Sequence, residues 1–234
     1  MSALTILRSY AQKSHPETLP PSVLLEFTDS TITIFDAYPK SVFHFLILPR
    51  VKPPLTIFKL ASLRTVLKTD KDHARAVLDN LGEEAKKVER QIREEMSKRY
   101  GYEWNIWTGF HAVPSMEHLH LHVLSADMCS PAMKLKKHYN SFHPSRGFFL
   151  SLEEMRALKA STYEPLLKED LACWRCGAGM KNMPTLKAHL QEEWDKEAKA
   201  KKAKLERKRK RDDVHGEAGD AKRHAPEKEQ ELQS

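Results

Sequence analysis

The stretch His118-Leu-His-Leu-His-Val-Leu124 alternates imidazole side chains with aliphatic ones. A period of two is typical of a β-strand, in which successive side chains point to opposite faces. We therefore expect the three histidines to share one face while the aliphatic residues pack on the other. Imidazoles gathered on one face can serve as nucleophile, acid or hydrogen-bond donor near neutral pH, which suits chemistry at a phosphate.

Two other interpretations of this stretch remain open from the residues alone. A single histidine on a strand is usually a structural bystander, although three in alternation are harder to explain that way. His-x-His is also a common ligand spacing for zinc or non-haem iron. A nearby acidic ligand would strengthen the metal interpretation. Glu117 points to the opposite face if the alternation holds, so Glu103 or Asp127 would have to be recruited instead.

The surrounding segments predict an α+β domain over residues 1–165, an antiparallel sheet with packed helices. Residues 23–27, 31–35 and 42–48 have strand character and are separated by turn-forming residues. From residue 63 to about 99 apolar residues recur three or four apart, which predicts one long amphipathic helix. Residues 103–110 and 118–125 then return to strand character.

A second module, residues 166–198, begins with the pair Cys173 and Cys176. The spacing Cys-x2-Cys-x12-His, with the third ligand at His189, is that of a zinc finger whose helix presents the histidine. The fourth position holds Glu193, which shares a helical face with His189, and Glu192 is the neighbouring candidate. We expect one structural zinc per chain; the alternative is an unmetallated helical hairpin.

The tail, residues 199–234, is expected to be basic and without fixed structure because it has few apolar residues. Residues 196–211 carry ten Lys or Arg against two Glu, a net charge of +8, so the total of +7 leaves −1 elsewhere. Lys204 to Arg211 has the density of a nuclear localisation signal, against the plainer interpretation of a solvated charge run. No stretch reaches the roughly 20 apolar residues that span a bilayer, so no membrane partner is expected.

The histidine stretch resembles the His-φ-His-φ-His-φ-φ signature of the histidine triad superfamily, in which φ is an apolar residue and whose members act on nucleotides at the α-phosphate. Other stretches resemble its aprataxin branch and cover most of residues 30–145. They are Phe35-Asp-Ala-Tyr-Pro-Lys40, Phe43-His-Phe-Leu-Ile-Leu-Pro49, Gly109-Phe-His-Ala-Val-Pro-Ser-Met116, Ser130-Pro131 with Asp127 before it, and Lys136-Lys-His-Tyr-Asn-Ser-Phe142. The pattern Cys-Cys-His-Glu resembles the zinc finger of some fungal members.

The resemblance implies roles for individual residues. The middle histidine, His120, would be the nucleophile, with His118 and His122 orienting it and donating to phosphate oxygens. His44 would be a further transition-state histidine and Lys137 a cation near the phosphates. The implied substrate contacts are Asp36 with the ribose hydroxyls, and Ser115 and His111 with phosphate or DNA. No catalytic metal is expected.

The resemblance implies a nuclear DNA-repair hydrolase that removes AMP from 5′ ends left by abortive ligation, through a covalent adenylyl-histidine. Its partner would be nicked or broken DNA with a 5′-adenylate, RNA–DNA junctions are a second substrate class to consider, and a monomer is expected. The alternatives are a general histidine triad hydrolase of free nucleotides and a non-catalytic nucleic-acid-binding protein. The zinc module and basic run argue against a hydrolase of free nucleotides, since small substrates need neither. The intact set of histidines, with Lys137, argues against a non-catalytic protein.

Overall fold

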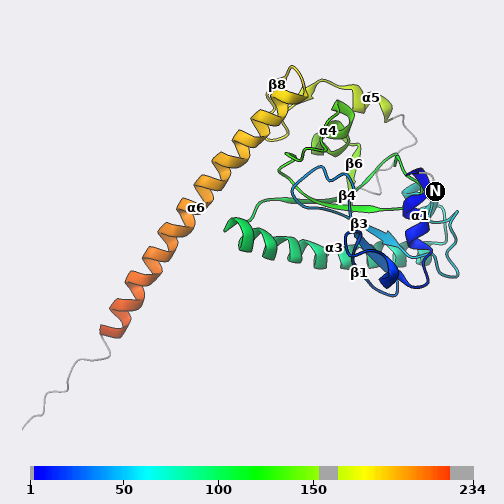
Figure 1. Cartoon of the computed structure of the whole chain (residues 1–234), viewed down its shortest axis with the longest axis horizontal. Helices are drawn as coiled ribbons and strands as arrows, with labels where there is room; N and C mark the ends of the chain where they lie inside the picture. Colours follow the sequence, from blue (N-terminus) through cyan, green and yellow to red (C-terminus); the bar gives the residue numbers. More distant parts are fainter. Residues whose placement is uncertain (1–2, 153–162, 222–234) are drawn as a thin grey trace, which may run out of the picture. The chain divides into compact units, whose positions relative to one another are not determined.

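A computed structural model describes residues 3–152 and 163–221. The described residues fall into two compact units, one up to Glu192 and one from Glu193 onward. The first unit is built on a six-stranded antiparallel sheet with strand order β1-β2-β3-β5-β4-β6 (Figure 1). Its strands are β1 (Leu24–Phe27), β2 (Thr31–Phe35), β3 (His44–Pro49), β4 (Ile106–His111), β5 (Leu121–Ser125) and β6 (Phe149–Ser151). The predicted antiparallel α+β fold is confirmed.

Helix α3 (Lys71–Tyr100) lies along one face of the sheet and contacts β2, β3 and β5. Its buried residues recur every three or four positions, from Ala74 to Met96, and form the apolar stripe that the sequence predicted. The predicted helix is nevertheless broken. The short α2 (Leu63–Val66) precedes α3, and the side chain of Asp70 caps the first turn of α3 by accepting from two backbone N–H groups.

The opposite face of the sheet is covered by smaller elements. Helix α1 (Ile6–Ala11), with η1 (Ala3–Thr5) before it and η2 (Pro16–Thr18) after it, packs on β2 and β3. There Leu7 and Ala11 share a buried cluster with Ile34 and Leu46. Helix α4 (Lys136–Phe142) and η3 (Pro144–Arg146) follow β5.

Gly109 of β4 permits the close approach of β6. A Cβ added at Gly109 would lie 2.6 Å from the carbonyl oxygen of Leu150, so no larger residue fits without moving the backbone. The pairing of Gly109 with His122 and of His111 with Phe149 brings the end of β4 beside the histidine strand.

The cysteine module packs on the same unit. It comprises α5 (Glu164–Lys168), the two-stranded pair β7 (Leu171–Ala172) and β8 (Gly179–Met180), and the start of α6 (Met183–Ala221). One buried cluster joins Leu124 of β5 and Tyr139 of α4 to Cys173, Leu186 and Leu190. The module therefore shares its core with the sheet, and the boundary at residues 165 and 166 stays a prediction.

Residues 199–221 differ from the expectation for the tail, because they continue α6. Alanine, lysine, glutamate and arginine dominate this segment, and all favour helix even without an apolar face. Lys201 and Glu197, one turn apart, form an ion pair at 2.8 Å. Residues 222–234 of the predicted tail lie outside the described residues. Within the described ranges, no helix has the length and apolar composition that a membrane span requires.

Candidate active site

A pocket of about 340 Å³ lies on the sheet face that bears the histidines. The turn between β2 and β3, the end of β4 with the loop after it, the start of β5, and α4 all contribute side chains. Seven of the eight predicted catalytic and substrate-binding residues line it: Asp36, His44, His111, Ser115, His120, His122 and Lys137. Residues far apart in the sequence thus converge on one cavity.

His120 is held in one orientation. Its Nδ1 atom lies 2.8 Å from the carbonyl oxygen of His118, and a carbonyl can only accept, so Nδ1 carries the proton. In the neutral ring Nε2 then keeps its lone pair. His120 lines the pocket, which makes Nε2 the nitrogen available for attack on an electrophile there.

His118 departs from the predicted alternation, because β5 begins only at Leu121. His118 has φ of 90°, a left-handed conformation that removes it from a regular strand. Its ring is buried, its Nε2 contacts the carbonyl oxygen of Pro49 at 2.7 Å, and it is absent from the pocket lining. His118 therefore acts on the site through its backbone carbonyl, and the expectation that all three imidazoles share one strand face is wrong.

His44 and His122 form a relay that ends in the pocket. The backbone N–H of Lys40 donates to Nδ1 of His44 at 3.1 Å, so Nε2 of neutral His44 carries a proton. That Nε2 lies 3.0 Å from Nδ1 of His122 and donates to it. His122 is left with a protonated Nε2, buried and without a partner among the described residues, which can donate to a bound phosphate oxygen.

Burial keeps these imidazoles neutral. Desolvation lowers the pKa of His44 to about 4 and that of His118 to about 4, and it lowers the pKa of His120. The pKa values of His111 and His122 fall well below their usual range for the same reason. Near pH 7 the site therefore presents a neutral nucleophile and neutral donors.

Asp36 lies beside His44 in the pocket. Its Oδ2 is 3.6 Å from Nε2 of His44, and its Oδ1 accepts from the backbone N–H of Tyr38 at 2.7 Å. Asp36 is 15% exposed at the side chain, which leaves part of the carboxylate open to the pocket. A carboxylate in this position can accept from a diol.

The pocket also holds two cationic side chains. Lys137 is exposed at the rim, as predicted, and Lys40, which the role assignment from sequence missed, lines the same cavity. Burial lowers the pKa of Lys40, whereas Asp36 opposes that shift. The sequence did contain a signal for Lys40. It lies in the stretch Phe35-Asp-Ala-Tyr-Pro-Lys40, where a turn after Asp36 leads the chain back to His44. His138 and Ser141 of α4 were also missed.

Asp36, His44 and His122 could be mistaken for a metal centre, since their ligand atoms lie within 4.8 Å of one another. The hydrogen bonds argue against it. Nε2 of His44 carries the proton because Nδ1 accepts from Lys40, and a protonated nitrogen has no lone pair to give to a metal. The carboxylates considered from sequence lie elsewhere: Asp127 accepts from Trp104, Val42 and Ser125, and Glu103 accepts from Ser97.

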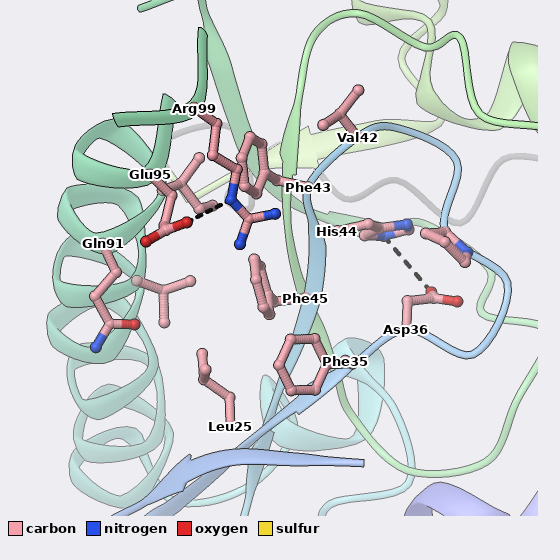
Figure 2. Close-up of a pocket in the computed structure, with 13 residues that line it drawn as sticks. Leu25, Phe35, Asp36, Val42, Phe43, His44, Phe45, Gln91, Glu95 and Arg99 are labelled. Atoms are coloured by element: carbon pink, nitrogen blue, oxygen red, sulfur yellow. Dashed lines mark hydrogen bonds and ion pairs between the residues drawn. The ribbon is translucent and has the colours of Figure 1, made fainter. Parts of the chain in front are cut away.

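A larger pocket of about 440 Å³ lies between α3 and the turn that joins β2 to β3 (Figure 2). Figure 2 shows Arg99, ion-paired with Glu95, beside Phe43, whose ring centre lies 5.8 Å from the guanidinium carbon. Phe45 and Phe35 also line this pocket. Only Asp36 and His44 are shared with the histidine pocket. Since the larger pocket lacks His120, His111 and Lys137, the histidine pocket is the candidate site for chemistry.

The cysteine module forms a second site. Ligand atoms of Cys173, Cys176 and His189 lie within 4.8 Å of one another, and Sγ of Cys176 is 3.3 Å from Nε2 of His189. Two ligands of one tetrahedral zinc lie roughly 3.5 Å apart, so the three residues fit that metal. Glu193 opens the second compact unit, where it pairs with Lys196 at 3.5 Å, and its role as fourth ligand stays a prediction.

Two family models match the chain. Residues 5–138 match the family described as scavenger mRNA decapping enzyme C-term binding, and residues 142–196 match the C2HE / C2H2 / C2HC zinc-binding finger. The second match covers Cys173, Cys176, His189 and Glu193. It begins upstream of the predicted module. This agrees with the buried cluster in which Tyr139 of α4 packs with Cys173.

Curated relatives match most of the chain. Aprataxin of Gallus gallus is 34% identical over 75% of this chain, and the match spans 52% of the chicken protein. An aprataxin-like protein of Schizosaccharomyces pombe is 33% identical over 74% of this chain and 75% of its own length. The crystal structure of the aprataxin orthologue Hnt3 in complex with DNA covers 83% of this chain and 96% of its own, with 32% identity and a TM-score of 0.68.

Proposed function

This chain belongs to the aprataxin family of histidine triad proteins, and on that premise we propose that it removes adenylate from the 5′ ends of DNA. The observation that carries the proposal is the bond between Nδ1 of His120 and the carbonyl of His118, which leaves Nε2 as a nucleophile in the pocket. The substrate would be a 5′-adenylate at a nick or break left by abortive ligation.

In the first step Nε2 of His120 attacks the α-phosphorus of the adenylate. The bond from that phosphorus to the bridging oxygen of the pyrophosphate breaks, and the DNA 5′-phosphate leaves. Nε2–H of His122 donates to the oxygens on which negative charge builds up, and the Lys40 and Lys137 side chains add positive charge. Asp36 would hold the ribose hydroxyls. Water then hydrolyses the adenylyl-histidine and releases AMP.

The zinc module would bind duplex DNA beside the pocket. We propose that phosphates contact Trp174, Arg175, Lys181 and Lys187. The Arg175 guanidinium lies 4.8 Å from the Trp174 ring centre. The complex of the related Hnt3 with DNA supports this assignment. Phosphate contacts position a protein without reading bases, so affinity should fall steeply with salt and depend little on sequence.

The basic run supports a nuclear location. Lys204 to Arg211 lie on α6, outside the compact sheet unit. The chain fused to a fluorescent protein should accumulate in nuclei, and a version with these residues replaced by glutamine should not. Equal distribution of the two would contradict the signal.

One comparison tests the activity. The purified chain is incubated with a nicked duplex carrying a labelled 5′-adenylate and, separately, with diadenosine tetraphosphate, using wild type and His120→Ala. We expect wild type to deadenylate the duplex and His120→Ala to leave it intact. Cleavage of the dinucleotide alone would support a general nucleotide hydrolase, and equal cleavage of the duplex by the variant would refute the assigned nucleophile.

A further inference from the structure

Helix α4 lies between the sheet and the zinc module, within the first compact unit (Figure 1). Four of its seven residues line the histidine pocket: Lys137, His138, Ser141 and Phe142. With 3.6 residues per turn these four share one side of the helix, and Tyr139 and Asn140 fall on the other side. Both Tyr139 and Asn140 are fully buried. One short helix therefore presents one side to the pocket and buries the other.

The hydroxyl of Tyr139 binds the backbone on both sides of a predicted zinc ligand. It donates to the carbonyl of Ala172 at 2.9 Å and accepts from the backbone N–H of Trp174 at 2.9 Å. Cys173 lies between these two residues and is buried. The backbone N–H of Cys173 donates to the carbonyl of Ala178 at 2.9 Å, which ties it to the other arm of the hairpin. Tyr139 thus joins α4 to the backbone that sets the position of Cys173.

Asn140 makes a second connection from the same side of α4. Its Nδ2 donates to the carbonyl of Leu167 at 3.2 Å and to the carbonyl of Glu169 at 2.8 Å. Leu167 belongs to α5 and also lines the histidine pocket. Helix α5 and the segment that leads from it into β7 are therefore held to α4 at the wall of the pocket.

We propose that Tyr139 is a positioning residue, through which the zinc knuckle, residues 173–176, holds α4 with Lys137 and His138 in place at the histidine pocket. The zinc module then supports catalysis as well as DNA binding. A displacement of about 1 Å in a group that positions the substrate can cost about 100-fold in rate, so a small shift of α4 matters. The effect on catalysis rests on the proposed function, whereas the connection from the knuckle to α4 does not.

The imidazole resonances of His138 report on α4 without any turnover. They are assigned by their loss in His138→Gln, and those of His73, at the start of α3 and outside the histidine pocket, are the internal control. In wild type, removal of zinc by a chelator should shift the His138 resonances, and reloading with zinc should restore them. In Tyr139→Phe the same removal should shift them less. No shift in wild type, or an equal shift in the variant, would overturn the proposal.

The rate of zinc release tests the same connection from the other end. Tyr139→Phe keeps the buried ring and loses two hydrogen bonds beside Cys173, so it should release zinc to a chelator about tenfold faster than wild type. Tyr102→Phe is the matched control, because Tyr102 is also buried but packs on Trp104, outside the zinc module. It should release zinc at the wild-type rate. Equal release by the two variants would count against the role of Tyr139.

Kinetics separate positioning from DNA binding. In zinc-loaded Tyr139→Phe we expect kcat on adenylated nicked DNA to decrease about tenfold or more, and the Kd for unmodified duplex to stay within about twofold of wild type. An unchanged kcat with lower folding stability would show a merely structural role, and a loss confined to duplex affinity would also contradict positioning. If wild type itself removes no adenylate, the proposed function fails, and the His138 resonances and the zinc release still decide whether Tyr139 connects the knuckle to α4.

Discussion

Nδ1 of His120 lies 2.8 Å from the carbonyl oxygen of His118, a residue whose φ of 90° turns that carbonyl toward the next histidine. This single contact fixes the tautomer of the proposed nucleophile, His120. The contact also gives different roles to two histidines that the triad pattern does not distinguish. His118 supplies a backbone acceptor, whereas His120 presents Nε2 to the pocket.

The two histidines should respond differently to removal of their side chains. His120→Ala should lower adenylate removal by at least about 1,000-fold, because the covalent step is lost. His118→Ala keeps the carbonyl that holds His120 and loses only the bond to Pro49, so a decrease of about tenfold is expected. Single-turnover rates on adenylated nicked DNA measure both. Equal losses would show that the His118 ring takes part in the chemistry.

The acid limb of the pH–rate profile should lie below pH 6.5. Burial lowers the pKa of His120, so the free enzyme keeps a neutral nucleophile at pH values where an exposed histidine is protonated. The midpoint of the acid limb of kcat/KM, which reports the free enzyme, should therefore lie below 6.5. DNA affinity measured over the same range is the control. A midpoint at or above 6.5 would contradict the neutral site.

Folding stability should follow the same histidines. The pKa of His44 and of His118 is about 4 when folded and near 6.5 when unfolded, so the unfolded chain binds more protons between these values. The free energy of unfolding should therefore be highest above pH 6.5. It should decrease as the pH falls toward 4, by up to about 3 kcal/mol per imidazole. Urea unfolding at pH 7 and pH 5 tests this, and equal values at both would contradict the burial of neutral rings.

Asp127 should matter for stability, even though it was a candidate metal ligand from sequence. Its carboxylate accepts from Val42 N–H at 3.0 Å, from Trp104 Nε1–H at 3.2 Å and from the Ser125 hydroxyl. Asp127→Ala leaves these donors unsatisfied and should lower the free energy of unfolding by roughly 3 kcal/mol or more. Asp127→Asn retains an acceptor and should cost less. Equal urea midpoints for wild type and Asp127→Ala would refute this role.

The zinc module allows a paired test of its fourth ligand. Wild type should contain about one zinc per chain, and Cys176→Ala should lose it together with affinity for duplex DNA. Glu193→Gln should release zinc to a chelator faster than wild type, whereas Glu192→Gln should not. If Glu192→Gln releases zinc and Glu193→Gln retains it, the assignment of the two neighbours is reversed.

Short-range patterns predicted much of the fold. Strand-forming residues set between turn-forming ones located β2 and β3. The three-or-four spacing located α3, because burial of one face of a helix imposes that period. The break before α3 has a local cause, the Asp70 cap, which the apolar spacing does not show. The left-handed turn at His118 was invisible, since histidine has no strong preference for φ near 90° and the surrounding contacts impose it.

The composition of the site was predictable in part. Motif resemblance named seven of the residues that line the histidine pocket, but it gave no account of how they are held. The tautomers follow from contacts such as Lys40 to His44, which depend on the turn geometry. The core shared by Leu124 and Leu186 is a long-range contact, and no local pattern marks it.

Trapping the intermediate shows whether His120 becomes adenylylated. Nicked DNA whose 5′-adenylate is labelled at the α-phosphate is mixed with excess enzyme and quenched in alkali within one turnover, and the labelled peptide is identified by mass spectrometry. We expect one adenylyl group on His120 in wild type and no labelled protein in His120→Ala. Label on another residue, or AMP release by His120→Ala at the wild-type rate, would contradict it.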